Sequence, residues 1–142
     1  MYKRQVYGVI DGGTTAVIEM AACAGLPLIG ERRDPCRATT YGVGQLIRHA
    51  LEHGCKKVIL GLGGSATNDG GTGAAAALGI RFLNRQGTPF IPTGGTLDEI
   101  VHIDCSNRFP GLDGAELIAM CDIDNPLCGP SGAAAVFGPQ KG

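Results

Sequence analysis

Glycines, hydroxyl side chains, an amide and an acid follow one another in the segment Gly63–Gly71, which we call the glycine loop. Glycines let backbone N–H groups converge on an anion, and a helix starting after the loop would add the partial positive charge of its N-terminus. Asp69 adds a proton acceptor or a metal ligand. A tight turn, with glycines serving only positive φ angles, is the structural alternative. The candidate ligand contacts in the loop are Gly63, Gly64, Ser65, Ala66, Thr67, Asn68, Gly70 and Gly71.

Polar residues also follow the last predicted strand, at Asp122-Ile123-Asp124-Asn125. Proteins that mix strands and helices commonly place ligand chemistry at the carboxyl ends of strands. Asp122 and Asn125 are therefore further candidate site residues, with Asp124 as the weaker acid. The alternative is that these side chains only cap a turn before Pro126.

Two motif matches point to other functions. Residues 61–66 fit the dinucleotide pattern G-x-G-x-x-G/A, but the turn-forming residues 68–71 interrupt the helix that this pattern requires, and no Gly-Lys-Ser/Thr of a P-loop follows. His49-Ala50-Leu51-Glu52-His53 fits the zinc-hydrolase pattern H-x-x-E-H. It lacks a clear third ligand, and both histidines fall on the polar face of a predicted helix. We keep a zinc hydrolase as the lesser alternative.

Hydrophobic patterns predict a mixed α/β fold with hairpins and short helices. Two β-rich runs, 6–10 and 15–20, flank the hairpin turn Asp11-Gly12-Gly13. A helix is expected over 40–53, and an apolar strand over 57–62 leads directly into the glycine loop. Shorter elements are expected as a turn or helix over 21–26 ended by Pro27, a helix over 74–78, a hairpin of 80–83 with 89–91, a capping box at 96–99, and a turn capped by Ser131.

The amino-acid composition excludes several classes of protein. The 142 residues carry 12 basic and 13 acidic side chains, which excludes a strongly basic nucleic-acid-binding module and an acidic tail. No apolar run approaches the roughly 18 residues of a membrane span, and no secretory signal opens the chain. The six cysteines include no C-x-x-C pair, so we expect buried free thiols and a cytoplasmic location. With seven aromatic residues, the core must consist of small aliphatic side chains.

Four long segments together resemble the type I bacterial glycerate kinase family. The central one is GLGGSATNDGGTGAAAALG at 61–79, and 15–26, 42–54 and 121–142 match in register. The resemblance covers 6–142 and implies the smaller inserted domain of the glycerate kinase fold, as a single domain after a non-native or unstructured lead at 1–5. The family's Asp-Ser-Phe-Lys, Gly-Glu-Gly and C-terminal Gly-Glu-Gly-Arg motifs are absent, so the chain is expected to be part of the enzyme and inactive alone.

The resemblance implies ATP- and Mg²⁺-dependent phosphorylation of D-glycerate to 2- or 3-phosphoglycerate. Asp69 would then accept or orient the hydroxyl proton as the catalytic residue, Asp122 would bind the metal ion, and Lys141 would neutralise charge, with Asn125 as a further ligand contact. Expected partners are glycerate and the nucleotide, with self-association through the face that the missing domain leaves. A non-catalytic domain binding small anions or carboxylates is the other alternative.

Overall fold

The first two strands form the predicted hairpin. In the computed structural model, which describes residues 5–31 and 33–142, β1 (Gly8–Ile10) pairs antiparallel with β2 (Thr15–Glu19). The connecting turn is the 3-10 segment η1 (Asp11–Gly13), where Gly12 has a φ of 65°, a conformation that glycine adopts readily. Residues 1–4 of the predicted lead lie outside the described residues.

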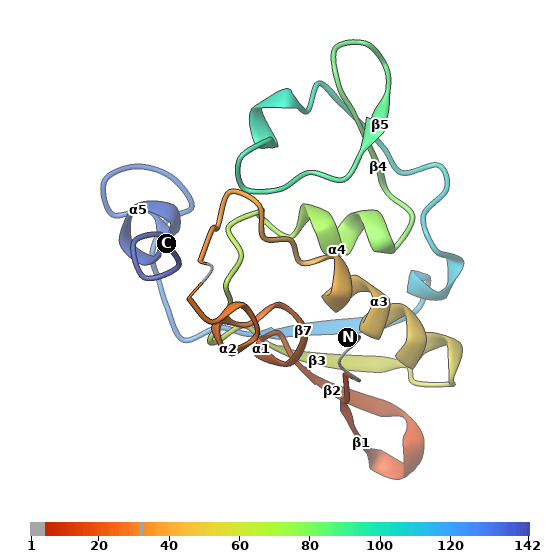
Figure 1. Ribbon diagram of the computed structural model, residues 1–142. Coiled ribbons are helices and arrows are strands. Elements are labelled where there is room, and N and C mark those ends of the chain that lie inside the picture. The colour runs from red at the N-terminus through yellow and green to blue at the C-terminus, as the bar shows by residue number, and fades with distance from the viewer. Residues whose placement is uncertain (1–4, 32) are drawn as a thin grey trace.

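A four-stranded sheet in the order β1-β2-β3-β7 forms the base of the molecule (Figure 1). β2 pairs parallel with β3 (Lys57–Gly61), and β3 pairs parallel with β7 (Glu116–Met120). In this register Gly61 lies beside Met120, so the glycine loop and the segment after β7 leave the sheet at the same edge. Both candidate segments follow the carboxyl ends of strands, as expected, and the structure adds that these two strands are neighbours.

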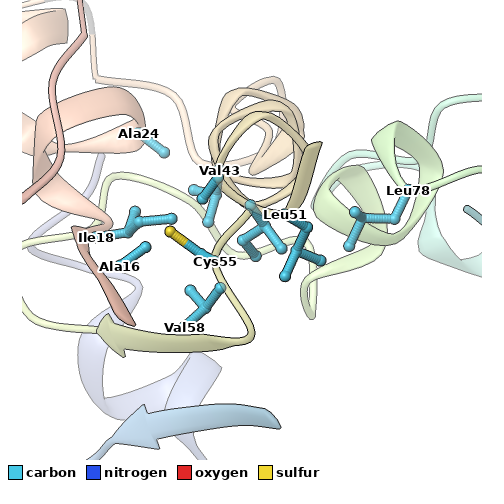
Figure 2. Close-up of a cluster of buried hydrophobic side chains, with 10 residues drawn as sticks. Ala16, Ile18, Ala24, Val43, Leu51, Cys55, Val58 and Leu78 are labelled. Atoms are coloured by element: carbon cyan, nitrogen blue, oxygen red, sulfur yellow. The ribbon is translucent and has the colours of Figure 1, made fainter. Parts of the chain in front are cut away.

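Two helices lie on one side of this sheet (Figure 1). α3 (Tyr41–Glu52) is the predicted long helix, and α4 (Thr72–Ala77) packs closely against it. The core between α3 and the sheet contains small aliphatic side chains, as expected (Figure 2). Its buried members are Ala16, Ile18, Ala24, Val43, Ile47, Ala50, Leu51, Cys55, Val58 and Leu78.

A second, antiparallel sheet of order β5-β4-β6 lies beyond α4 (Figure 1). β4 (Arg81–Leu83) and β5 (Pro89–Phe90) form the predicted hairpin, but β6 (His102–Asp104) was not predicted. Two 3-10 segments, η2 (Leu97–Glu99) and η3 (Pro110–Leu112), flank β6 in the sequence.

Three expectations about short helices were wrong. Pro27 does not end a helix: it lies in the first turn of α2 (Leu26–Ile29), which follows α1 (Ala21–Ala24), because that turn needs no N–H from proline. The capping box before η2 does not form, since the hydroxyl of Thr96 accepts a hydrogen bond from the Thr93 N–H instead. The last helix, α5 (Ala133–Phe137), begins after Gly132 and has no side-chain cap from Ser131.

The surface differs from the expectation in the exposure of its cysteines. All six cysteines are free thiols, but four are exposed and Cys55 alone among the six is fully buried. Every residue of β7 is exposed, with Leu117 at 51% and Met120 at 61%. In the described part of the chain, no helix is long and apolar enough to cross a membrane.

Candidate functional site

The glycine loop and the segment after β7 face each other across an open cavity of about 650 Å³. Ten of the sequence-predicted residues line it, although they come from two segments some 50 to 80 positions apart. They are Gly63, Gly64, Ser65, Thr67, Asn68, Asp69, Gly70, Gly71, Asp122 and Lys141. Most of the remaining lining is apolar, with Ile123, Leu127 and Phe137 among its side chains, and Thr40 and Gln140 are its polar members.

Two of the predicted contacts are not among the lining residues. Ala66 is 1% exposed, and its N–H donates to the carbonyl of Ala24 at 2.8 Å, so it is not available to a ligand. The Asn125 amide donates to the carbonyl of Ser131 at 2.9 Å and stabilises its own loop. Both assignments came from position in the sequence, which does not report these local hydrogen bonds.

The turn at the start of the glycine loop presents backbone donors to the cavity. Gly63 and Gly64 are exposed, and none of the acceptors in the described residues bonds to their N–H groups. Gly64 has a φ of 68°, so the turn itself requires glycine there. The loop is held in place by an isolated bridge between Gly25 and Ser65. Free N–H groups on a fixed turn are suited to binding an anion.

Lys141 places a positive charge beside this turn. Its ammonium group donates to the carbonyl of Thr67 at 2.6 Å and to the hydroxyl of Ser65 at 3.0 Å. The residue is 9% exposed, and this burial lowers the pKa of Lys141 from its usual value, while the negative charge of Asp69 acts in the opposite direction. The lysine therefore binds the C-terminal segment to the loop and places an amine at the cavity.

Asp69 is a buried residue of the loop. Its side chain is 1% exposed and accepts five hydrogen bonds, four of them at Oδ2. The donors at Oδ2 include the N–H and hydroxyl of Thr40 and the hydroxyl of Thr39, residues that sequence reasoning missed. Thr40 lies 29 positions before Asp69, and nothing in the local pattern signals that the two would meet.

Asp122 is the exposed carboxylate of the cavity wall. No group of three His, Cys, Asp or Glu side chains able to hold a metal ion occurs within residues 5–31 and 33–142. One carboxylate does fit Mg²⁺, which proteins often bind through one or two carboxylates together with water and substrate phosphates. Asp122 could thus bind Mg²⁺ in combination with a phosphate-bearing ligand.

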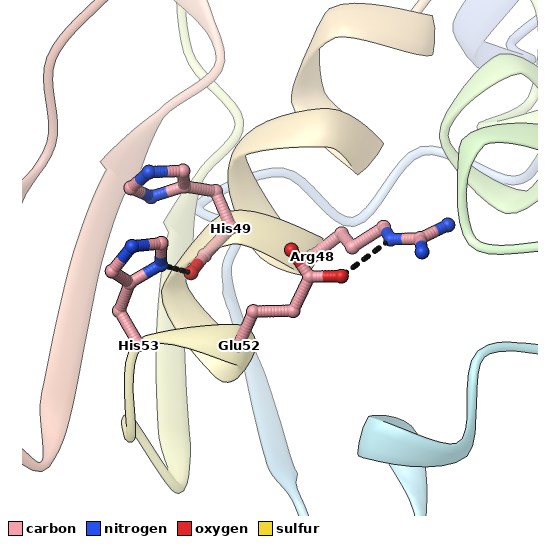
Figure 3. A network of polar contacts seen from close by, with 4 residues as sticks. All are labelled: Arg48, His49, Glu52 and His53. Carbon is pink, nitrogen blue, oxygen red and sulfur yellow. Dashed lines mark hydrogen bonds and ion pairs between the residues drawn. The ribbon is translucent and has the colours of Figure 1, made fainter.

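The two histidines of the zinc pattern are exposed on α3 (Figure 3), and neither lines the cavity. The rings of His49 and His53 stack with their centroids 3.9 Å apart, and Glu52 forms an ion pair with Arg48. His49 Nδ1 lies 2.9 Å from the hydroxyl of Tyr7, and the described residues provide no third metal ligand. The described residues therefore do not support a zinc hydrolase.

Comparison with known proteins assigns the chain to a family. The model of the glycerate kinase family matches residues 2–142. The chain belongs to this family. It is 50% identical over 140 residues to the glycerate kinase of Bacillus subtilis (strain 168) and 46% identical over 137 residues to the glycerate 2-kinase of Escherichia coli (strain K12).

A solved structure of a family member agrees with the fold. The crystal structure of a Salmonella typhimurium LT2 protein assigned as glycerate kinase 2 superposes with a TM-score of 0.90 at 46% identity, over 95% of this chain. The mixed α/β fold expected from the sequence is confirmed. The chain spans 37% of that structure, 37% of the B. subtilis relative and 36% of the E. coli relative.

Proposed function

We propose that this chain forms part of a kinase that transfers a phosphoryl group from ATP to D-glycerate. The observation that carries the proposal is the cavity between the glycine loop and the segment after β7, where Gly63, Gly64 and Lys141 offer donors and a cation to an anion. Family membership supplies the substrate class. The E. coli relative is a glycerate 2-kinase, which favours 2-phosphoglycerate over 3-phosphoglycerate as the product.

The chemistry of the cavity suits phosphoryl transfer. The protein's task in this reaction is to position two anionic reactants and to stabilise negative charge, with little covalent chemistry of its own. The N–H groups of Gly63 and Gly64 would bind a carboxylate or phosphoryl oxygen, and Lys141 would offset the charge. Ser65, Thr67 and Asn68, together with the backbone at Gly70, would add neutral contacts along the loop, whereas the predicted contact at Gly71 has its N–H bonded to Asp69 Oδ1 at 3.1 Å.

Asp122 would bind Mg²⁺ together with the phosphates of ATP, and the ion would neutralise charge on them. The sequence-based role of Asp69, accepting or orienting the hydroxyl proton of glycerate, stays a prediction. We also propose a cytoplasmic location, in keeping with free thiols, and self-association through the exposed face of β7.

A chimera tests this function. The chain is 50% identical to the corresponding segment of the B. subtilis glycerate kinase and can replace it within that enzyme. The chimera is expected to consume ATP only when D-glycerate is present, with ³¹P NMR identifying the phosphorylated hydroxyl. The 142-residue chain alone is expected to bind glycerate or phosphate without turnover, because it spans only about a third of the relative.

The parent enzyme and the Lys141→Met chimera are the controls for the replacement. A chimera that unfolds at the same temperature as the parent but lacks glycerate-dependent turnover would contradict the proposal. Turnover by the 142-residue chain alone would show instead that the remaining segments are dispensable for the reaction.

A further inference from the structure

The first N–H groups of α4 already have partners within the fold. A helix normally leaves its first four N–H groups unpaired, and these form its anion-binding end. Here the Thr72 N–H donates to the Asp69 carbonyl at 3.1 Å, and the Gly73 N–H donates to Asp69 Oδ2 at 3.2 Å. The Ala74 N–H donates to the Thr40 hydroxyl at 2.9 Å. The start of α4 therefore has no donors left for an external anion.

The same carboxylate also reaches the start of α3. Asp69 Oδ2 accepts the Thr40 N–H at 2.7 Å and the Thr40 hydroxyl at 2.8 Å. That hydroxyl is also the group that accepts from Ala74, so one chain of hydrogen bonds connects α3, Asp69 and α4. Thr40 is 2% exposed, so the connection lies inside the protein.

The packing around the Asp69 carboxylate leaves no room for a side chain at position 73. A Cβ at Gly73 would lie 2.1 Å from the Thr39 hydroxyl and 2.9 Å from Asp69 Oδ2. Glycine at this position lets α4 approach the carboxylate closely enough for the Gly73 N–H to bond to it. The other oxygen, Oδ1, accepts the Gly71 N–H at 3.1 Å, so a substrate hydroxyl would compete with protein donors at both oxygens.

We propose that Asp69 is a positioning residue, whose carboxylate takes the place of a bound anion at the start of α4 and ties the glycine loop to α3. The inference rests on the proposed function and specifies the role of Asp69 in it. The ligand anion then binds at Gly63, Gly64 and Lys141, at the turn that opens the loop. Asp69 acts on the reaction by fixing those donors and does not touch the substrate.

Thermal unfolding of the 142-residue chain gives the first test. Asp69→Asn keeps the shape of the side chain but replaces one acceptor oxygen with a donor facing protein donors. Tm is expected to fall by about 5 to 10 °C. Thr40→Val removes the bridging hydroxyl and is also expected to lower Tm. Thr40→Ser keeps the hydroxyl and is expected to keep the Tm of the unmodified chain. Asp98→Asn, on an exposed acid, is the matched control and should leave Tm unchanged.

Titration with inorganic phosphate, followed through the amide NMR signals of Gly63 and Gly64, gives the second test. Positioning predicts that Asp69→Asn and Thr40→Val shift both signals before phosphate is added and weaken phosphate binding at least about tenfold. It also predicts that the double variant loses less than the sum of the two, because both act through one network. Thr40→Ser should bind like the unmodified chain.

The opposite result would overturn the proposal. If Asp69→Asn keeps the Tm and the loop signals of the Asp98→Asn control, the carboxylate does not organise the loop and is free to act on substrate. If Asp69→Asn fails to fold, Thr40→Val and Thr40→Ser are compared instead. Equal Tm values and equal loop signals in these two variants would contradict the proposal. If the unmodified chain binds neither phosphate nor glycerate, the proposed function fails, while the Tm comparison still decides the role of Asp69.

Discussion

Lys141 and Asp69 are oppositely charged groups that hold one short loop. Lys141 bonds to Ser65 and Thr67 of the loop, and Asp69, within the loop, bonds to the starts of two helices. Their charges attract, and an anionic ligand at Gly63 and Gly64 would meet the lysine while the carboxylate remains shielded by its own donors. Ligand binding should therefore depend on the protonation of Lys141.

The Lys141→Met variant tests this dependence. Because burial lowers the pKa of Lys141, the amine loses its proton at a lower pH than a free lysine. Phosphate affinity should fall as the pH rises through this lowered pKa, and it should be weak and nearly independent of pH in Lys141→Met. The free energy of unfolding depends on pH in the opposite direction. Between the lowered pKa and about 10.5 the unfolded chain binds more protons than the folded chain, so the free energy of unfolding increases as the pH rises across that window.

Isothermal titration calorimetry and denaturant unfolding between neutral and alkaline pH measure the two effects. Lys56→Met removes an exposed lysine and is the control for the loss of one charge. Equal pH profiles for Lys141→Met and Lys56→Met would remove Lys141 from the anion site.

At the scale of elements, the contact between α3 and α4 fixes the position of α4, the helix that follows the glycine loop. A Cβ at Gly44 would lie 2.3 Å from the Ala74 carbonyl oxygen and 2.7 Å from the Ala77 Cβ. The two helices can approach this closely only because position 44 has no side chain. Small residues on both helices thus set the position of Ala74, whose N–H bonds to Thr40.

Gly44→Ala is therefore expected to destabilise the fold by about 1 to 3 kcal/mol, since a well-packed contact must open. Gly42→Ala is the matched control on the same helix, because a Cβ there has its nearest neighbour at 3.6 Å. Both changes raise helix propensity by up to about 1 kcal/mol, so the difference between them isolates the packing. Urea unfolding measures it, and equal stability of the two variants would contradict the close contact.

The sequence predicts those elements whose pattern is long enough to be distinctive. α3 follows from its spaced apolar residues, and β3 from a short apolar run that leads into the glycines. β6 has three residues and becomes a strand because Ile103 pairs with Phe82, a contact that no local pattern contains. The residues of the glycine loop were predictable because they directly follow the apolar run of β3. Thr39 and Thr40 meet Asp69 only in the folded chain, so no local pattern predicts their hydrogen bonds to it.

At the scale of the whole molecule, the sheet is incompletely covered. Parallel sheets are usually buried on both faces, yet all five residues of β7 are exposed. The chain spans about a third of the relatives to which it is similar. We expect an apolar strand of this kind to associate with another surface when nothing else covers it.

Sedimentation velocity over a range of concentrations tests this expectation on the 142-residue chain. The sedimentation coefficient should rise with concentration, and the double variant Leu117→Lys with Met120→Lys should reduce that rise by placing charges on β7. Val101→Lys, at an apolar residue of similar exposure outside the strands, is the control. A chain that stays monomeric at every concentration would contradict self-association.

The bonds from Lys141 to the glycine loop also have a consequence for the timing of synthesis. Lys141 follows Thr67 by 74 positions, so the ribosome adds it long after the loop. At roughly 5 to 20 residues per second, the delay is about 4 to 15 s. Throughout that interval the nascent loop has its backbone donors but not its cation. Strong affinity for an anion should therefore arise only after the residues between Thr67 and Lys141 have been made.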